Sequence, residues 1–229
     1  MKILALIAFF AAAFLHLLGL SVENNTLIIN TKPLLMPLLA VWLFAATKHP
    51  SEYPFLRKAV LGALVFSTLG DVFLMFSGGM FFLLGLGAFL LAHLFYMGAF
   101  SSVSSLKSGF LRQKPGWILP FIAFPILLLM LLWNGIPVGM KMPVAAYAGI
   151  ISVMALSVVN LKRKITDTVF WTLLPGALLF MISDSSLAVA KFGEVFEGSR
   201  MVIMVTYIGG QYLLVRGVAG VLESSTSQL

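Results

Sequence analysis

The sequence contains no cysteine, and only 10% of its 229 residues are charged. The absence of cysteine excludes disulfides, thiolate nucleophiles and cysteine-based metal sites. Histidine is also scarce, since the only three, His16, His49 and His93, lie on separate segments without the spacing of metal ligands. The two acids inside the apolar segments, Asp71 and Asp184, would alone provide too few ligands for a metal ion, so we predict no metal site and no cofactor.

Apolar residues fill most of the chain, which is 60% hydrophobic with a mean hydropathy of +1.04. Soluble domains are about half apolar and about a quarter charged. A helix needs about 20 residues to cross a bilayer, and apolar runs of about this length recur along the whole chain. We therefore predict an all-α, polytopic membrane protein, a bundle of about eight transmembrane helices over residues 2–20, 33–46, 57–76, 79–100, 116–133, 141–161, 168–190 and 200–222.

These spans leave little sequence between them, so residues 1–222 are predicted to form a single transmembrane domain. The remaining residues, 223–229, read "ESSTSQL" and predict a polar, disordered tail. The first span has no small-residue cleavage site after it, which is typical of a retained helix rather than a removed signal.

The net charge of +7 is distributed unevenly between alternate loops. One set of loops holds Lys48, Arg57, Lys58, Lys107, Arg112, Lys114, Lys162, Arg163 and Lys164, and the other holds only Lys32, Lys141, Lys191 and Arg200. This asymmetry follows the positive-inside rule and places both termini in the cytoplasm, in what we expect to be a bacterial inner membrane. The basic excess therefore indicates topology and contact with anionic lipid, not a nucleic-acid partner.

A similarity between two segments of the chain suggests an internal duplication. "GALVFSTLGD", residues 62–71, resembles "GALLFMISD", residues 176–184, and the two lie four spans apart with equal orientation. The second and sixth spans also both begin with Lys shortly before Pro, at Lys32-Pro33 and Lys141-Met142-Pro143. A 4+4 parallel duplication would place a site between two halves. Chance similarity between apolar helices is the alternative interpretation.

Short, glycine-rich connections predict close antiparallel neighbours. The link "SGGM" between the third and fourth spans is tight, so Asp71 should lie near a sharp hairpin. Small residues let membrane helices approach closely without a hydrophobic driving force between them. The glycines expected to do so are Gly62, Gly70, Gly85 and Gly87.

Only two acids, Asp71 and Asp184, lie well inside predicted spans. A carboxylate at the centre of a bilayer costs about 2.5–3.5 kcal/mol on insertion scales, and such residues usually serve a function. Each follows a small residue, Gly70 or Ser183, which should leave room beside the carboxylate. The alternative is a structural hydrogen bond between helices, for example from Tyr or Lys.

The two acids are predicted to be level with each other in the outer half of the membrane. At about 1.5 Å per residue, Asp71 lies roughly 21 Å and Asp184 roughly 24 Å from the cytoplasmic start of its span. Five polar residues accompany them: Tyr147 and Tyr207 near the same level, Gln211 a turn deeper, Lys32 near the outer surface, and His93 below the acids.

Each companion also has a structural interpretation. Lys32 could extend its ammonium to the membrane surface. Tyr147 and Tyr207 could belong to an aromatic belt at the interface. His93 could tie two helices together, because buried polar groups need partners in any case.

Several short motifs, in this order and spacing, resemble the YhhN-like lysoplasmalogenase family over nearly the whole chain: "KPLLMP", "GDVFLM", "HLFY", "GALLFMISDS" and "YIGGQYLL". The resemblance implies hydrolysis of the vinyl ether bond of a lysoplasmalogen, which gives a fatty aldehyde and glycerophosphoethanolamine or glycerophosphocholine. It also implies catalytic roles for Asp71 and Asp184 and substrate-binding roles for Lys32, His93, Tyr147, Tyr207 and Gln211.

The chemistry of a vinyl ether agrees with two acids. The bond is stable to base and labile to acid, because protonation at the β carbon gives an oxocarbenium ion. Two desolvated carboxylates can supply both the proton and an anion that stabilises the cation. Glycoside hydrolysis follows the same chemical logic. The sequence does not say which aspartate has which role.

Two other functions fit the same residues. Intramembrane acids and a parallel repeat are also typical of a proton-coupled membrane transporter of a small or lipid-like solute. Against this, no unusually broken helices occur in matching places, although Pro33, Pro37 and Pro143 interrupt the pattern. A membrane scaffold whose acids only tie helices together is the third interpretation.

Overall fold

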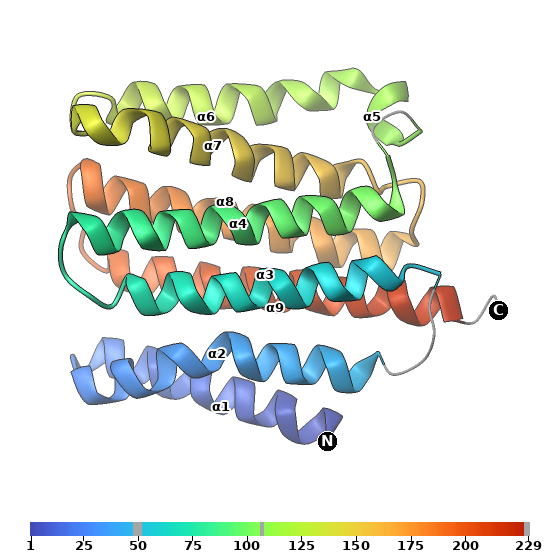
Figure 1. Ribbon diagram of the computed structural model, residues 1–229, viewed down its shortest axis with the longest axis horizontal. Coiled ribbons are helices and arrows are strands. Elements are labelled where there is room, and N and C mark those ends of the chain that lie inside the picture. The colour runs from blue at the N-terminus through green and yellow to red at the C-terminus, as the bar shows by residue number, and fades with distance from the viewer. Residues whose placement is uncertain (48–51, 106–107, 227–229) are drawn as a thin grey trace. The chain divides into compact units, whose positions relative to one another are not determined.

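A computed structural model describes residues 1–47, 52–105 and 108–226 of the chain (Figure 1). Lys48, His49 and Lys107, which were counted above, lie outside these residues, as does the end of the predicted tail, 227–229. Over the described part of the chain every regular element is a helix.

The helices are α1 (Lys2–Ser21), α2 (Asn25–Ala46), α3 (Pro54–Phe73), α4 (Gly79–Val103), α5 (Phe110–Gln113), η1 (Pro115–Ile118), α6 (Leu119–Leu132), α7 (Val138–Val159), α8 (Asp167–Phe192) and α9 (Ser199–Thr226). Each predicted span has a helical counterpart, with η1 and α6 together forming the fifth. Seven of these segments are long and apolar enough to cross a membrane, which confirms a polytopic bundle of helices.

The remaining long helix, α3, differs from the other seven in charge. It has 20 residues and carries Arg57 and Lys58 in its first turns and Asp71 near its end. Its middle, from Ala59 to Gly70, is free of charged residues. Because α3 is only 20 residues long, every stretch of 18 residues in it includes all three charges, whereas α8 and α9 carry three charges each over 26 and 28 residues.

The chain forms two compact units. Unit 1 comprises Met1–Ser102 and Val215–Leu229, and unit 2 comprises Val103–Leu214. The first boundary falls between the predicted fourth and fifth spans, where a 4+4 duplication would divide the chain. The duplication itself and the single domain over 1–222 stay predictions.

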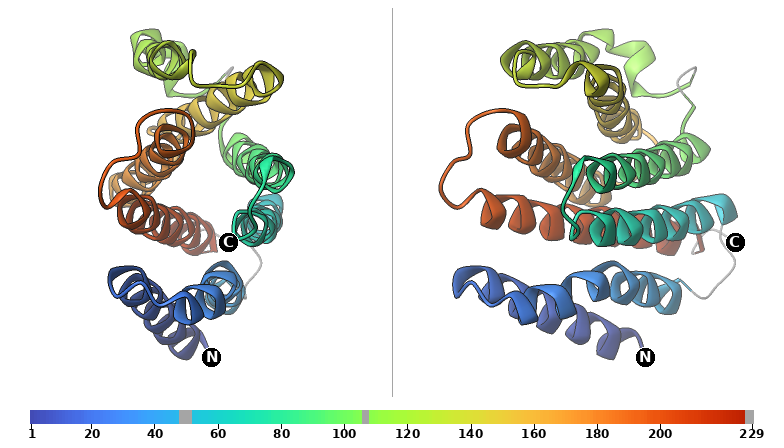
Figure 2. Two further views of the ribbon diagram at one scale, coloured as in Figure 1. Left: turned by 90° about the vertical axis from the view of Figure 1, so that its left-hand side faces the viewer. Right: turned by 60° about the vertical axis from the view of Figure 1, so that its left-hand side comes forward.

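Unit 1 begins with a tight hairpin of α1 and α2, which lie side by side (Figures 1 and 2). The Asn24 side chain caps α2 by accepting a hydrogen bond of 3.1 Å from the backbone N–H of Leu27. Between the two helices, His16 Nδ1 lies 3.0 Å from the hydroxyl of buried Thr31. Burial of this polar pair ties the hairpin together.

The predicted start of the second span was wrong, because α2 begins at Asn25 rather than at residue 33. Pro33 and Pro37 lie inside the helix instead of opening it. Proline is tolerated within membrane helices when neighbouring groups satisfy the freed backbone carbonyls. The polar stretch "NTLIINTK" is therefore helical, and Lys32 lies about 10 Å from the start of α2 at 1.5 Å per residue.

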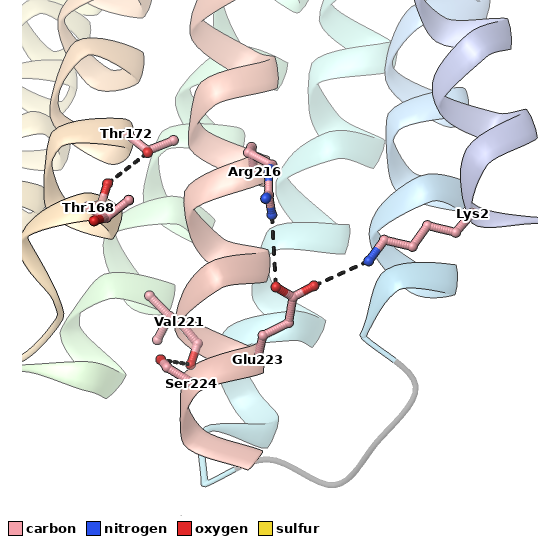
Figure 3. Close-up of polar contacts among 7 residues, drawn as sticks. All are labelled: Lys2, Thr168, Thr172, Arg216, Val221, Glu223 and Ser224. Atoms are coloured by element: carbon pink, nitrogen blue, oxygen red, sulfur yellow. Dashed lines mark hydrogen bonds and ion pairs between the residues drawn. The ribbon is translucent and has the colours of Figure 1, made fainter. Parts of the chain in front are cut away.

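The end of α9 lies beside the start of α1 (Figure 3). Glu223 accepts a hydrogen bond of 3.3 Å from Lys2 Nζ, and its other oxygen lies 3.9 Å from Arg216 Nη1. The start of α1 and the end of α9 therefore lie at the same end of unit 1. Because α9 continues to Thr226, the prediction that the tail from residue 223 is disordered was wrong for residues 223–226.

In unit 2, α6 and α7 form a second hairpin (Figure 2). At the far end of α7, the Asn160 side chain accepts from the backbone N–H of Leu111 at 3.1 Å and donates to the carbonyls of Ser104 and Ser105 at 3.2 and 3.1 Å. Gly109 leaves the space for it, since a Cβ there would lie 2.1 Å from the Asn160 amide. One side chain thus fixes the connection into α5.

Aromatic rings surround Lys162 just after Asn160. Its Nζ lies 5.3 Å from the ring centre of Phe110, 5.6 Å from those of Trp117 and Phe170, and 6.0 Å from that of Trp171. A cation over aromatic faces at such distances is attracted by the ring quadrupoles. We call these five residues the Lys162 cage; it joins α5, η1 and α8 at one end of unit 2.

Candidate active site

Asp71 in unit 1 is paired with Lys32. The Lys32 Nζ lies 3.7 Å from Asp71 Oδ1, and the two side chains are only 14% and 4% exposed. The Lys32 side chain therefore does not extend to the membrane surface, because it points at an acid on the next helix. Burial of two charges is costly unless they are close, and losing one partner typically destabilises a protein by about 3–5 kcal/mol.

The end of α3 packs closely against α4 beside Asp71. A Cβ on Gly70 would lie 2.6 Å from the ring of Phe89, so Gly70 makes room for that ring. Gly62 and Gly85 provide similar close contacts, with Phe95 and Leu74. Gly87 does not, since nothing lies within 4 Å of its Cβ position, and its predicted role was wrong.

His93 is completely buried on α4, one turn beyond Phe89. Residues four apart share a face of a helix, so His93 lies on the side of α4 that faces α3. Because Phe89 is opposite Gly70, His93 lies about 6 Å from the level of Gly70 along the helix. This agrees with the prediction that His93 lies below Asp71.

Asp184 in unit 2 is held by Tyr147. The Tyr147 hydroxyl of α7 donates a hydrogen bond to Asp184 Oδ2 on α8, and the tyrosine is 8% exposed. Tyr147 is thus not limited to an interfacial belt, because its hydroxyl reaches an acid inside the unit. The contact also confirms that the two residues lie at one level.

Ser183, the residue before Asp184, connects α8 to α9. The Ser183 hydroxyl donates a hydrogen bond of 2.9 Å to the carbonyl of Ile203 on α9. The Ser183 hydroxyl therefore ties α8 to α9. Together, Tyr147 and Ser183 fix the rotation of α8 from both sides, and with it the direction in which Asp184 points.

Two glycines bring α8 and α9 into backbone contact. A Cβ on Gly176 would lie 2.8 Å from the backbone nitrogen of Leu214, and one on Gly210 would lie 2.9 Å from that of Phe180. The ring of Tyr207 packs edge-on against Phe180 at 5.6 Å, one turn from Asp184 on α8. Gln211, one turn further along α9, is completely buried. Both predicted companions therefore lie along the α8–α9 contact.

The predicted site residues are divided between the units. Lys32, Asp71 and His93 belong to unit 1, and Tyr147, Asp184, Tyr207 and Gln211 belong to unit 2. Within each unit the structure brings one acid together with one donor from the preceding long helix. Such an arrangement can hold an anion in one unit and orient a second carboxyl group in the other.

Three supporting residues were not predicted: Thr31, Gly210 and Asn160. A buried polar residue within an apolar segment was the available signal for Thr31, which pairs with His16. The motif "YIGGQYLL" contains Gly210, but no spacing rule indicated that it would meet Gly176. Asn160 stands at the end of an apolar run, where its side chain can cap backbone groups.

The chain is similar to characterised proteins over most of its length. The model of the YhhN family matches residues 27–218. Lysoplasmalogenase TMEM86B of Homo sapiens is 36% identical over 155 residues, which are 67% of this chain and 60% of that protein. The mouse TMEM86B is 34% identical over 190 residues, covering 82% of this chain and 73% of the relative. Lysoplasmalogenase TMEM86A of Homo sapiens is 28% identical over 220 residues, covering 91% and 86%.

No solved structure matches the chain. The relationship of this chain to other proteins therefore rests on sequence similarity alone. The family match covers both units, from α2 to α9, and includes both acids and both of their donors. The chain belongs to the YhhN family.

Proposed function

We propose that this protein is a lysoplasmalogenase, a membrane hydrolase that cleaves the vinyl ether bond of a lysoplasmalogen. Its products would be a fatty aldehyde and glycerophosphoethanolamine or glycerophosphocholine. The relatives named above are called lysoplasmalogenases, and they cover much of this chain. The observation that carries the proposal is the pair of acids on long helices of an apolar bundle, each held by a donor from the preceding long helix.

The proposed reaction is acid catalysis by Asp71 and Asp184. One carboxyl group protonates the β carbon of the vinyl ether, and the other carboxylate stabilises the oxocarbenium ion that results. Water then adds to the cationic carbon, and the hemiacetal collapses to the aldehyde and the free glycerol hydroxyl. The steps need only water and proton transfer, so the proposal invokes no metal and no cofactor.

The other polar residues would bind substrate. Tyr207 and Gln211 are buried one turn apart on α9, and His93 is buried on α4. Buried hydroxyl, amide and imidazole groups suit a polar glycerophospho group that enters an otherwise apolar bundle. We propose that the substrate reaches them from the lipid bilayer, because its single chain already resides there.

The direct test is an assay of the purified, full-length protein in detergent with a lysoplasmalogen. We expect stoichiometric release of aldehyde and of the glycerophospho product. The matched control substrate is a lysophospholipid with an ester at the same position. It should be inert because it lacks the vinyl ether double bond whose β carbon accepts the proton. Absence of aldehyde from a monodisperse preparation would favour the transporter or scaffold interpretation instead.

The mechanism requires that both carboxyl groups act on one substrate molecule. A variant with Asp71→Cys and Asp184→Cys in the cysteine-free chain tests this requirement. We expect a short bifunctional thiol reagent to bridge the two positions in the membrane. A pair with Asp184→Cys and an exposed position, Leu127→Cys, is the matched control. Equal labelling without a bridge in either pair would contradict a shared site.

We propose further that the protein lies in a bacterial inner membrane with both termini in the cytoplasm. Ser108 lies in the connection before α5 and Asn134 in the connection after α6. Both residues are exposed and suit single-cysteine labelling. An impermeant thiol reagent added to intact spheroplasts should label the cysteine of Asn134→Cys and not that of Ser108→Cys. The reverse pattern would invert the orientation.

A further inference from the structure

Positive charge is concentrated at the end of unit 2 where α7 connects to α8. Residues 108–118 and 160–172 contain one acid, Asp167, and five basic residues: Arg112, Lys114, Lys162, Arg163 and Lys164. The opposite end of the same unit, residues 133–142 and 191–200, contains three basic residues and two acids. The excess is therefore a property of one end of unit 2 and not of its connections in general.

Hydrogen bonds and packing join the two basic segments into one surface. The backbone N–H of Phe110 donates to the carbonyl of Asn160 at 3.2 Å. The Phe110 ring belongs to a buried cluster with Leu111 and Val159, and the guanidinium carbon of Arg163 lies 5.9 Å from the centre of that ring. The cations of both segments are therefore presented on a folded part of the unit.

Two exposed tryptophans border these charges. Trp117 and Trp171 are 46% and 59% exposed, although their ring centres lie only 5.6 and 6.0 Å from Lys162 Nζ. Tryptophan is enriched where a membrane protein passes the lipid headgroups, because its ring is apolar and its N–H is polar. Exposed tryptophans beside basic side chains thus indicate the level of the headgroups.

An exposed apolar surface begins directly after the basic segment. Leu119 and Ile122, in the first turn of α6, follow η1 and are 68% and 52% exposed. A ligand that covers both surfaces has an anionic part for the basic side chains and an apolar part for α6. A free phosphate or an acidic polypeptide would use only the charges, whereas a phospholipid uses both.

We propose that the segment α5–η1 and the connection from α7 to α8 form a binding site for the headgroup of an anionic phospholipid. Arg163 and Lys164 are exposed and bind the phosphate, and the planar guanidinium of Arg163 suits paired hydrogen bonds with phosphate oxygens. The acyl chains lie along the exposed apolar residues of α6. Asp184 is about 26 Å from the start of α8 at 1.5 Å per residue, so this site is separate from the candidate active site and independent of the proposed function.

Quenching of tryptophan fluorescence tests whether this end of unit 2 prefers an anionic lipid. The full-length protein is reconstituted in phosphatidylcholine vesicles, and a small share of the lipid is replaced by brominated phosphatidylglycerol or, in a parallel series, by brominated phosphatidylcholine. Trp133→Phe, present in every sample, removes the exposed tryptophan at the opposite end of the unit, and Trp42 is only 2% exposed. The quenching then reports on Trp117 and Trp171.

We expect phosphatidylglycerol to reach half of its maximal quenching at a share of the lipid about tenfold lower than phosphatidylcholine, because basic residues near a membrane attract anionic lipid. High salt should reduce this preference, since it screens exposed charges. Arg163→Gln combined with Lys164→Gln should bring the preference close to none.

Two further double variants accompany this pair. Arg112→Gln combined with Lys114→Gln, on the other basic segment, should also lower the preference. Lys141→Gln combined with Lys191→Gln removes the same charge from the opposite end of unit 2 and is the matched control, which should keep the preference of the parent protein. Unchanged monodispersity and helix content in lipid-free detergent establish that each variant is folded.

Equal quenching by the two lipids would overturn the proposal, and so would a preference that survives both pairs of substitutions in the basic segments. An equal loss in the control would overturn it too, because the net charge of the protein would then attract the lipid. Glycerol phosphate and polyglutamate, added at equal concentrations of negative charge, should not relieve the quenching. Relief by either one would replace the phospholipid with a free anion or an acidic polypeptide as the occupant.

Discussion

The aspartates of unit 1 and unit 2 each receive a polar donor, but the two donors are chemically different. In each, an aspartate lies on a long helix and receives a donor from the preceding long helix: Lys32 reaches from α2 to Asp71 on α3, and Tyr147 reaches from α7 to Asp184 on α8. One donor is an ammonium and the other a phenol. The donors to the two aspartates therefore differ in charge between the units.

The units also differ in how their helices approach. In unit 1, Gly62, Gly70 and Gly85 each meet a side chain, whereas Gly176 and Gly210 in unit 2 meet backbone atoms of the facing helix. Side chains can move aside, but a backbone held by helical hydrogen bonds cannot move without shifting the whole helix. The surroundings of Asp184 are therefore expected to tolerate less change than those of Asp71.

The largest expected effect is the loss of either carboxyl group. Asp71→Asn and Asp184→Asn keep the size of the side chain but remove both the negative charge and the acidic proton. We expect turnover to fall at least about a hundredfold in each, with insertion and monodispersity retained. Asp167→Asn, an exposed acid in the first turn of α8, is the control and should be fully active. Normal activity of either site variant would remove that acid from the mechanism.

The second prediction compares two glycines on different helices. Gly210→Ala would place a Cβ 2.9 Å from the backbone nitrogen of Phe180 and 3.0 Å from the Gly176 carbonyl oxygen. Overpacking of this kind costs about 1–3 kcal/mol, so thermal unfolding in detergent should occur at a clearly lower temperature. Gly87→Ala, with open space at its Cβ position, should leave the melting temperature unchanged or raise it through helix propensity. Equal effects of both would contradict the close contact of α8 and α9.

The third prediction concerns the Lys162 cage, a feature of unit 2. Lys162→Met keeps the long apolar stem and removes the ammonium. We expect a loss of about 0.5–2 kcal/mol in the free energy of unfolding, the range of cation–π interactions from exposed to desolvated sites. Lys164→Met, which changes an exposed lysine two residues away, is the control and should be neutral. A neutral Lys162→Met would show that the rings pack without help from the charge.

The smallest expected effect belongs to the end of unit 1. Glu223 pairs with Lys2 and Arg216, and about half of each side chain is exposed. Exposed ion pairs contribute about 0.2–1 kcal/mol and are screened by salt. Glu223→Gln should therefore lower the unfolding temperature slightly at low salt, with the difference lost at high salt. An effect that persists at high salt would mean that Glu223 does more than pair charges.

The sequence alone predicted the helices, because length and apolar composition suffice to identify membrane spans. The roles of the site residues stay predictions. It predicted the start of α2 wrongly, since Pro33 and Pro37 suggest a helix boundary in a soluble protein but are tolerated inside a membrane helix. Counting 1.5 Å per residue placed Tyr147 level with Asp184, because a straight helix keeps its register. It placed Lys32 just before a span, whereas Lys32 lies about 10 Å from the start of α2.

Counting residues along the chain does not give the rotation of each helix about its own axis. Gly70 and Ser183 both precede an acid, yet one faces the Phe89 ring and the other donates to the Ile203 carbonyl. Gly87 and Gly210 look equally suited to close packing, but only Gly210 faces a neighbour. Rotation depends on contacts between distant segments, which periodicity within one uniformly apolar helix does not reveal.

The measurement that tests the central claim most directly is isotope incorporation by the wild-type protein. A lysoplasmalogen is hydrolysed in heavy water that carries labelled oxygen, and the aldehyde is trapped at once by reduction. Acid catalysis predicts one deuterium on the carbon next to the alcohol carbon, on a single face, and labelled oxygen in that alcohol and not in the glycerol product. A product without carbon-bound deuterium, or with the label in the glycerol hydroxyl, would contradict protonation at carbon and with it the roles given to Asp71 and Asp184.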